Sequence, residues 1–424
     1  MRDSSSTRVV IPIPSPLGDA VAPSQSPART VAMVTEVCRS LWAGAVVISG
    51  ATMAVPEFEA KLGLGFHLFL VTDLARDLEY RLDELGASGQ RGRVDARRRP
   101  QLRSFDGETD PARLFWLAYR CFLERAVQDS RAILNDDGAL ADAPTRHIVR
   151  QHLRALVEAL EWGGNVLERY LEARSDEERT GFDRWVADRD HDQVDRQAGR
   201  RRPREARRDD RFSTFAHTRM YRTHSETSAL APTDEYEADL LELVRVNRDE
   251  IDAIETFCLV YFDLLDDAPL DMLYDLARTA WDEARHALLG QRLLEHLGHD
   301  PFTFPCSMIG IMVRSMLGGW DALAQISLFG ELNIISPMRS LATRARWRGE
   351  GVIADSFEFI CSDEAQHLKR IRRWLKSHHP LGDLDTITSH TQRRAGQELE
   401  RAGVLNEEYF VGLTKAQVFK LLGE

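Results

Sequence analysis

Two short segments of this sequence each carry a glutamate and a histidine at a spacing that suits a metal ion. The first reads DEARH from Asp282 to His286, and the second reads DEAQH from Asp363 to His367. Both lie in stretches whose apolar residues recur at helical spacing, and residues three apart on a helix share one face. Each glutamate can therefore bind the same ion as the histidine that follows it. One such pair alone could be a solvated pair, but two copies predict two metal ions side by side.

The elements that would position these segments are four helices between residues 232 and 380. The pattern predicts them at about 232–265, 269–297, 307–346 and 351–378, with the third bent at Gly318-Gly319 and at Pro337. The two segments fall in the second and fourth helices. The first and third helices should then each supply one inward-facing carboxylate.

The third helix offers Glu331, whose neighbours on the same face are apolar. A carboxylate buried in such surroundings is costly unless something neutralises it. The first helix offers several acids, and the amphipathic pattern favours Glu255 over Glu250 because apolar residues lie one turn on either side of Glu255. Glu242, Asp249 and Glu250 stand in more polar surroundings and are predicted to face solvent.

The resulting set of ligands holds four carboxylates and two imidazoles. Four negative charges balance two divalent cations, which makes the set tolerable in a water-poor interior. This donor chemistry suits two iron ions, with manganese or a mixed pair as the alternative. The predicted metal ligands are Glu255, Glu283, His286, Glu331, Glu364 and His367.

A substrate pocket beside these ions would be lined by side chains on the same helix faces. Apolar stripes are first of all packing surfaces, so ordinary core positions are the competing interpretation. The predicted lining residues are Cys258, Phe262, Ser327, Leu328, Ile335 and Cys361.

The composition narrows the classes of protein. The chain has 424 residues, 43% of them hydrophobic, and a net charge of -12, so nothing indicates a nucleic-acid binder. Its five cysteines are scattered and form no C-x-x-C pair, as in a reduced intracellular protein. The longest apolar run, Leu41 to Val55, is short for a membrane span and contains two glycines, which favours a buried helix. We expect a soluble, cytoplasmic protein that is not bound to a membrane.

The chain divides into five predicted parts. Residues 1–30 form a flexible tail, 31–175 an N-terminal helical bundle without a metal, and 176–230 a charged, Arg-rich linker. Residues 231–380 form the metal-binding bundle, and two short helices occupy 381–424. The N-terminal lobe could be packing support, a homodimer surface or a docking surface, and the arginine-rich run could alternatively bind an anionic partner.

Residues 232–380 resemble the ferritin-like di-iron carboxylate superfamily. The resemblance rests on Glu255, Glu331 and the two segments, with 28 positions from Glu255 to Glu283 and 33 from Glu331 to Glu364. It implies an all-α chain with a C-terminal ferritin-like four-helix bundle. The DEARH form is similar to the first motif of bacterial multicomponent monooxygenase hydroxylases, which implies that Asp282 and Asp363 hydrogen-bond the ligand imidazoles.

Departures from particular relatives narrow the implied activity. Gly290 stands where radical-generating subunits carry a tyrosine, and Ile335 stands where methane-type hydroxylases carry a threonine. The C-x-x-C iron site of rubrerythrin-like peroxidases is missing, and the extra lobe is unlike a storage ferritin.

We therefore expect a non-haem di-iron oxygenase that hydroxylates, desaturates or N-oxygenates a small organic substrate. Its other reactants would be O2 and electrons from an external donor, because the sequence has no flavin or nicotinamide fingerprint. The alternatives are a ferroxidase and a structural helical protein whose site is vestigial.

Overall fold

The structure is a computed structural model that describes residues 26–87, 107–135, 141–188, 203, 205–212, 214–215, 235–330 and 334–401. Its regular elements in these ranges are helices, apart from one short parallel pair of strands, β1 (Thr214–Phe215) and β2 (Cys306–Ser307). The prediction of an all-α chain is therefore confirmed.

The first half of the chain supplies α1 (Pro27–Ala54), α2 (Phe58–Glu84), α4 (Pro111–Phe115), the π-helix η3 (Trp116–Leu123), α5 (Glu124–Asn135), α6 (Ala143–Glu172) and α7 (Asp176–Ala187). The second half supplies α9 (Glu235–Arg248), α10 (Ile251–Leu264), α11 (Leu270–His296), α12 (Ile309–Leu317), α13 (Gly319–Gln325), the π-helix η4 (Ile326–Gly330), α14 (Ile335–Arg348), α15 (Gly351–His378) and α16 (Leu384–Arg401).

Local sequence signals account for several helix boundaries. Ser26 caps α1 through its side chain and is followed by Pro27, whose fixed φ suits a first helical position. Ser175 and Glu178 form a reciprocal capping box at the start of α7. At the other end of the chain, α15 stops before Pro380, which disfavours helical geometry in the residue that precedes it.

The helix predicted at 307–346 is broken into shorter pieces. Gly318 has a φ of 67°, a left-handed conformation that other residues rarely adopt, and it separates α12 from α13 as the sequence predicted. Pro337 produces no bend, because it lies in the first turn of α14, where its missing N–H costs nothing. Residues 331–333 between η4 and α14 lie outside the described part of the chain.

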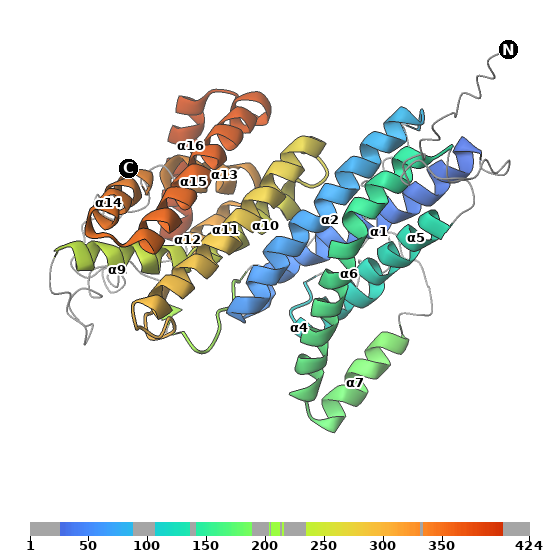
Figure 1. The fold of residues 1–424 in the computed structure, drawn as a ribbon, viewed down its shortest axis with the longest axis horizontal. Coiled ribbons are helices and arrows are strands. Elements are labelled where there is room, and N and C mark those ends of the chain that lie inside the picture. The colour runs from blue at the N-terminus through green and yellow to red at the C-terminus, as the bar shows by residue number, and fades with distance from the viewer. Residues whose placement is uncertain are drawn as a thin grey trace, which may run out of the picture.

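The helices pack side by side along one long axis, with α2 between α1 and α11 (Figure 1). The larger hydrophobic cluster joins α1 and α2 to α10 and α11 through buried side chains such as Leu41, Leu68, Phe257 and Leu276. Each large side chain buried in this way contributes about 1.5–3 kcal/mol. A smaller cluster links α9 and the end of α11 to α14 and α15. The same cluster extends to α12, α13, α15 and α16, so the N-terminal helices share a continuous core with most helices of the second half.

Several predicted boundaries fall on elements that the structure describes. Helix α1 already begins at Pro27, inside the predicted tail, and residues 1–25 of that tail are outside the described residues. Helix α7 occupies the start of the predicted linker, and Arg208 from the arginine-rich run has a side chain only 2% exposed. Of the two predicted C-terminal helices, α16 extends the first, whereas residues 402–424 are not described.

Helix α1 is long and apolar enough, by length and composition, to cross a membrane. In its most apolar 18-residue window, 78% of the residues are buried against the rest of the chain. The run from Leu41 to Val55 is buried throughout, which agrees with the buried helix predicted for it.

A buried histidine on α2 gives the fold a specific sensitivity to acid. His67 is 5% exposed, and its Nδ1 lies 2.8 Å from the hydroxyl of Tyr119 on η3. Burial lowers the pKa of His67 to about 3, so the folded chain stays neutral there at pH values where the unfolded chain takes up a proton.

We expect wild type to lose stability below pH 6.5 through this group, by about 1.4 kcal/mol for each pH unit until the folded pKa is reached. A His67→Gln variant, which can still pair with Tyr119, should lack that loss. Denaturant unfolding of both proteins between pH 7 and pH 5 measures the difference. Parallel curves for the two proteins would contradict the assignment.

Candidate metal centre

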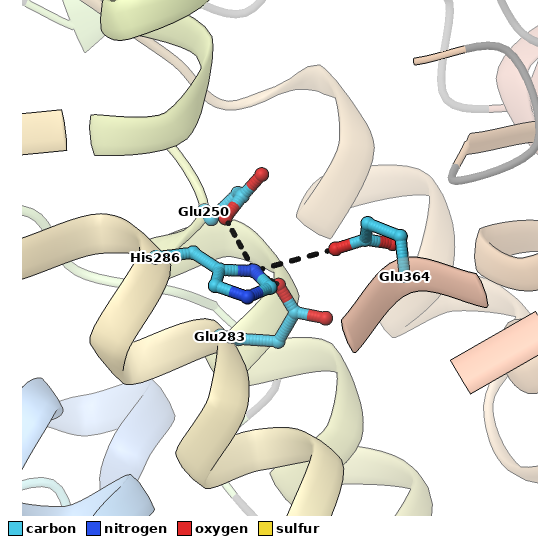
Figure 2. Close-up of side chains that lie close together, drawn as sticks. All are labelled: Glu250, Glu283, His286 and Glu364. Atoms are coloured by element: carbon cyan, nitrogen blue, oxygen red, sulfur yellow. Dashed lines mark ion pairs between the residues drawn. The ribbon is translucent and has the colours of Figure 1, made fainter. Parts of the chain in front are cut away.

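Helices α11 and α15 bring both Glu-x-x-His pairs to one place. Glu283 and His286 lie on α11, and Glu364 and His367 lie on α15; all four are at most 2% exposed. A fourth carboxylate, Glu250, comes from the junction between α9 and α10. Figure 2 shows Glu250, Glu283 and Glu364 around the ring of His286.

The three carboxylates surround one nitrogen of His286. Its Nδ1 lies 3.1 Å from Glu250 Oε2, 3.5 Å from Glu283 Oε2 and 3.3 Å from Glu364 Oε1. One ligand atom from each of Glu250, Glu283, His286 and Glu364 lies within 4.8 Å of the others. This group is compact enough to share a single cation.

The second imidazole repeats this relation to two of the carboxylates. His367 Nδ1 lies 3.2 Å from Glu283 Oε1 and 3.7 Å from Glu364 Oε2, and the centroids of the two imidazole rings are 5.9 Å apart. Glu283 and Glu364 therefore each turn one oxygen toward His286 and the other toward His367. Carboxylates in this position can bridge two neighbouring ions.

The atoms that face one another have no hydrogen-bond partner of their own. They are Glu250 Oε2, Glu283 Oε1, His286 Nδ1, Glu364 Oε2 and His367 Nδ1. Buried polar atoms are nearly always paired, and each unpaired one costs about 1–3 kcal/mol. Five such atoms directed at one small volume could be satisfied together by a bound cation.

The opposite nitrogen of each imidazole is held by the aspartate of the other segment. His286 Nε2 lies 3.2 Å from Asp363 Oδ2, and His367 Nε2 lies 3.3 Å from Asp282 Oδ2. With Nε2 donating its proton to a carboxylate, Nδ1 is left as the metal-binding atom. The hydrogen bonds expected for Asp282 and Asp363 are thus present, and they cross between the two helices.

The electrostatic state of the site follows from its burial and its charges. Burial alone would lower the pKa of His286, but Glu250 and Asp363 raise it well above its ordinary value. Burial opposes charging of His367 as well, yet Asp282, Glu283 and Glu364 raise its pKa. The two imidazoles in turn lower the pKa of Glu364 to about 2, against the effect of burial. Both imidazoles therefore hold a proton more strongly than a free histidine does, and a metal ion that binds at Nδ1 has to displace it.

Glu250 takes the place that the sequence assigned to Glu255, and that assignment is corrected. The prediction that Glu250 and Asp249 face solvent is also wrong, because their side chains are only 13% and 10% exposed. The pattern preferred Glu255 because of its apolar neighbours, but α10 is buried on every side from Ile254 to Phe262. A helix that is apolar all round carries no amphipathic signal that separates one face from another. Five residues along a helix also turn the chain by about 140°, which directs Glu255 away from Glu250.

Glu255 instead faces α2 in a buried cluster with two cations. Its Oε1 accepts from Lys61 Nζ at 2.5 Å and from Arg208, and Glu255 and Lys61 are completely buried. Lys61 also donates to the carbonyl oxygen of Thr52 at 2.6 Å. The negative charge of Glu255 is therefore neutralised by two cationic side chains and not by a metal.

A glycine on α11 allows the α9–α10 junction to come close enough for Glu250 to reach the site. A Cβ atom on Gly290 would lie 2.2 Å from the backbone nitrogen of Arg248, well inside contact distance. Arg248 is itself fixed, because its guanidinium donates to the carbonyl of Phe304 at 2.8 Å and to that of Pro305 at 3.0 Å. Gly290, noted in the sequence only for lacking a tyrosine side chain, thus has a packing role.

Gly290→Ala should therefore separate α11 from the junction by roughly 1 Å and destabilise the fold by about 1–3 kcal/mol. It should also weaken metal binding, because Glu250 would move away from His286. A matched control is Gly181→Ala on α7, where no heavy atom lies within 4 Å and alanine should be neutral or stabilising. Equal melting temperatures for the two variants would contradict this role.

The other predicted residues are distributed unevenly around the centre. Glu331 lies outside the described residues. Cys361 is close to the site, since Glu364 and His286 both influence its pKa, and its Sγ lies 3.8 Å from the carbonyl oxygen of Ile335. Ser327 is buried with an unpaired Oγ, and Leu328 beside it is half-buried.

The remaining two predicted pocket residues lie on α10. Cys258 belongs with the Glu255 cluster, because burial raises the pKa of its thiol to about 12 with Thr52, Glu255 and Lys61 as its neighbours. Phe262 is 3% exposed and is part of the larger hydrophobic cluster. The packing interpretation therefore suits both positions.

Comparison with known proteins adds no family to this description. No family model, curated protein or solved structure matches the chain.

Proposed function

We propose that this cluster is a dinuclear carboxylate metal centre of the ferritin-like type, and that the protein is an O2-dependent oxidoreductase. The observation that carries the proposal is the set of five unpaired ligand atoms, from Glu250, Glu283, His286, Glu364 and His367, that face one another in a buried space. Carboxylate oxygens with one imidazole per ion suit iron or manganese.

The charge of the described donors supports more than one cation. Three carboxylates and two neutral imidazoles leave three negative charges in a site that is almost completely buried. One divalent ion would leave a net negative charge, which a low-dielectric interior disfavours. Two divalent ions with a fourth carboxylate would bring the site to neutrality.

Glu331 is the fourth carboxylate in this proposal. Glu250 precedes Glu283 by 33 positions, and Glu331 precedes Glu364 by the same 33. The π-helix η4 ends at Gly330, immediately before Glu331, and π-helical turns often accompany functional sites. Two like-spaced units, each a glutamate followed by a Glu-x-x-His segment, would then supply one half of the centre each.

The reaction proposed is the oxidation of a small organic substrate by O2, with electrons from an external donor. Two reduced iron ions would supply the electrons that O2 accepts and the oxidising power used on the substrate. The chain fixes both imidazoles through Asp282 and Asp363. It directs one oxygen of Glu283 and one of Glu364 toward each imidazole, and it keeps bulk water out by burying the four ligands on α11 and α15.

Exposure of the fully reduced, iron-loaded protein to O2 tests the proposed reaction before any substrate is known. An oxygenase should consume one O2 per centre. When more ferrous iron is then added without any other reductant, O2 consumption should not resume. Continued oxidation of many equivalents of added iron would overturn the oxygenase proposal in favour of a ferroxidase.

A further inference from the structure

One arginine on α11 contacts both aspartates that hold the imidazoles. Arg285 Nη2 donates to Asp282 Oδ1 at 2.6 Å and to Asp363 Oδ2 at 2.8 Å. Each of these carboxylates accepts from the imidazole carried by the other helix. Arg285 therefore lies at the crossing point of two hydrogen-bonded chains, one ending at His286 and the other at His367.

The second segment has no corresponding cation. Gln366 occupies the place in DEAQH that Arg285 occupies in DEARH, and Gln366 is exposed to solvent. Asp282 has a second basic partner in Arg278, whose Nη2 lies 2.9 Å from Asp282 Oδ1. For Asp363, Arg285 is the one arginine or lysine within ion-pair distance among the described residues. The two halves of the centre thus depend on Arg285 to different degrees.

We propose that Arg285 is the shared positioning residue of the centre, a single cation that orients both ligand imidazoles through Asp282 and Asp363. It acts by fixing the carboxylates to which both Nε2 protons are donated. The loss of a residue that orients metal ligands in this way typically lowers metal affinity by about 10–100-fold. The proposal rests on the proposed metal centre for its effect on ions, but the orientation of the imidazoles can be observed without metal.

The experiment compares Arg285→Gln, Arg285→Lys and Arg278→Gln with wild type. In the metal-free proteins, the Nε2–H resonances of His286 and His367 are followed by NMR. Arg285→Gln should shift and broaden both, His286 most, whereas Arg278→Gln should affect His367 alone. The lysine variant should restore part of the wild-type spectrum, because it keeps the charge without the planar fork of donors.

Titration with Mn²⁺, followed by the EPR signal of the free ion, gives the second measurement. Arg285→Gln should weaken binding by roughly 10–100-fold at both sites, and Arg278→Gln by less than about fivefold, because a partly exposed ion pair contributes little. If Arg285→Gln matched Arg278→Gln both in manganese binding and in its Nε2–H resonances, the positioning role of Arg285 would be overturned. The proposed metal centre would be unaffected by that result. If wild type binds no manganese but Arg285→Gln still shifts both Nε2–H resonances of the metal-free protein, the proposed metal centre fails and the positioning role stands.

Discussion

Glu283→Ala and Glu364→Ala are each expected to abolish the stabilisation that metal ions give to the folded chain. Each carboxylate turns its two oxygens toward different imidazoles, so in the proposed centre its loss would remove a ligand from both ions at once. At a free metal concentration 100 times the Kd, binding to the folded state stabilises wild type by about 2.7 kcal/mol. Thermal unfolding with and without ferrous iron under anaerobic conditions should show this increase in wild type and none in either variant.

Glu358→Ala is the matched control on the same helix. Glu358 pairs with Arg346 on the surface and is 56% exposed, so its removal should leave the metal-dependent rise in melting temperature intact. A rise of the same size in Glu283→Ala as in Glu358→Ala would show that iron binds elsewhere.

Glu255→Ala should produce the opposite pattern, with a large loss of stability and intact metal binding. Removing this carboxylate leaves Lys61 and Arg208 buried without their counter-charge, and breaking a buried ion pair on one side costs about 3–5 kcal/mol. Of the two imidazoles, Glu250 lies close to that of His286. Glu250→Ala should therefore weaken the binding of one of the two proposed ions and change the stability of the metal-free fold little. Denaturant unfolding of the metal-free variants and a separate measurement of iron binding distinguish the effect of Glu255→Ala from that of Glu250→Ala.

The milder Glu255→Gln variant keeps the experiment informative if the alanine variant does not fold. It preserves the shape of the side chain and removes only the charge. Loss of iron binding in Glu255→Gln at wild-type stability would return Glu255 to the ligand set and contradict the structure. Unchanged iron binding in Glu250→Ala would contradict the assignment of Glu250 as a metal ligand.

The helices that carry the two segments could be predicted from the sequence because their start and stop signals are strong. Helix α15 runs from Gly351 to His378 as predicted, and α11 differs from its prediction by one residue at each end. Glu283, His286, Glu364 and His367 converge because the spacing of three residues dictates their common face. Long helices with clear ends are the features that local chemistry determines best.

The choice between Glu250 and Glu255 could not be made from apolar neighbours, because α10 is buried on all sides. The break between α9 and α10 was also missed, since it depends on the contact of Gly290 with Arg248 and on the carbonyls that hold Arg248, all of which are tertiary. One signal was nevertheless present. Glu250 reproduces the 33-residue interval from Glu331 to Glu364, whereas Glu255 gives 28. An internal repeat would have identified the ligand where the amphipathic pattern could not.

The cluster of Lys61, Arg208 and Glu255 was beyond prediction for a different reason. Its members are 194 and 47 positions apart along the chain, and nothing local in any of the three segments indicates the others. The arginine-rich run around Arg208 has the composition of a solvated linker. Only the packing of α2 against α10 shows that this one arginine is an internal counter-ion.

The most direct test of the central claim is an iron count. The metal-free chain is loaded with ferrous iron under anaerobic conditions, freed of unbound metal and analysed for iron per polypeptide. A dinuclear centre predicts about two irons per chain, held by Glu250, Glu331 and the two Glu-x-x-His pairs. Fewer than about one iron per chain would contradict it, because buried carboxylates in this number would then be neutralised by protons alone.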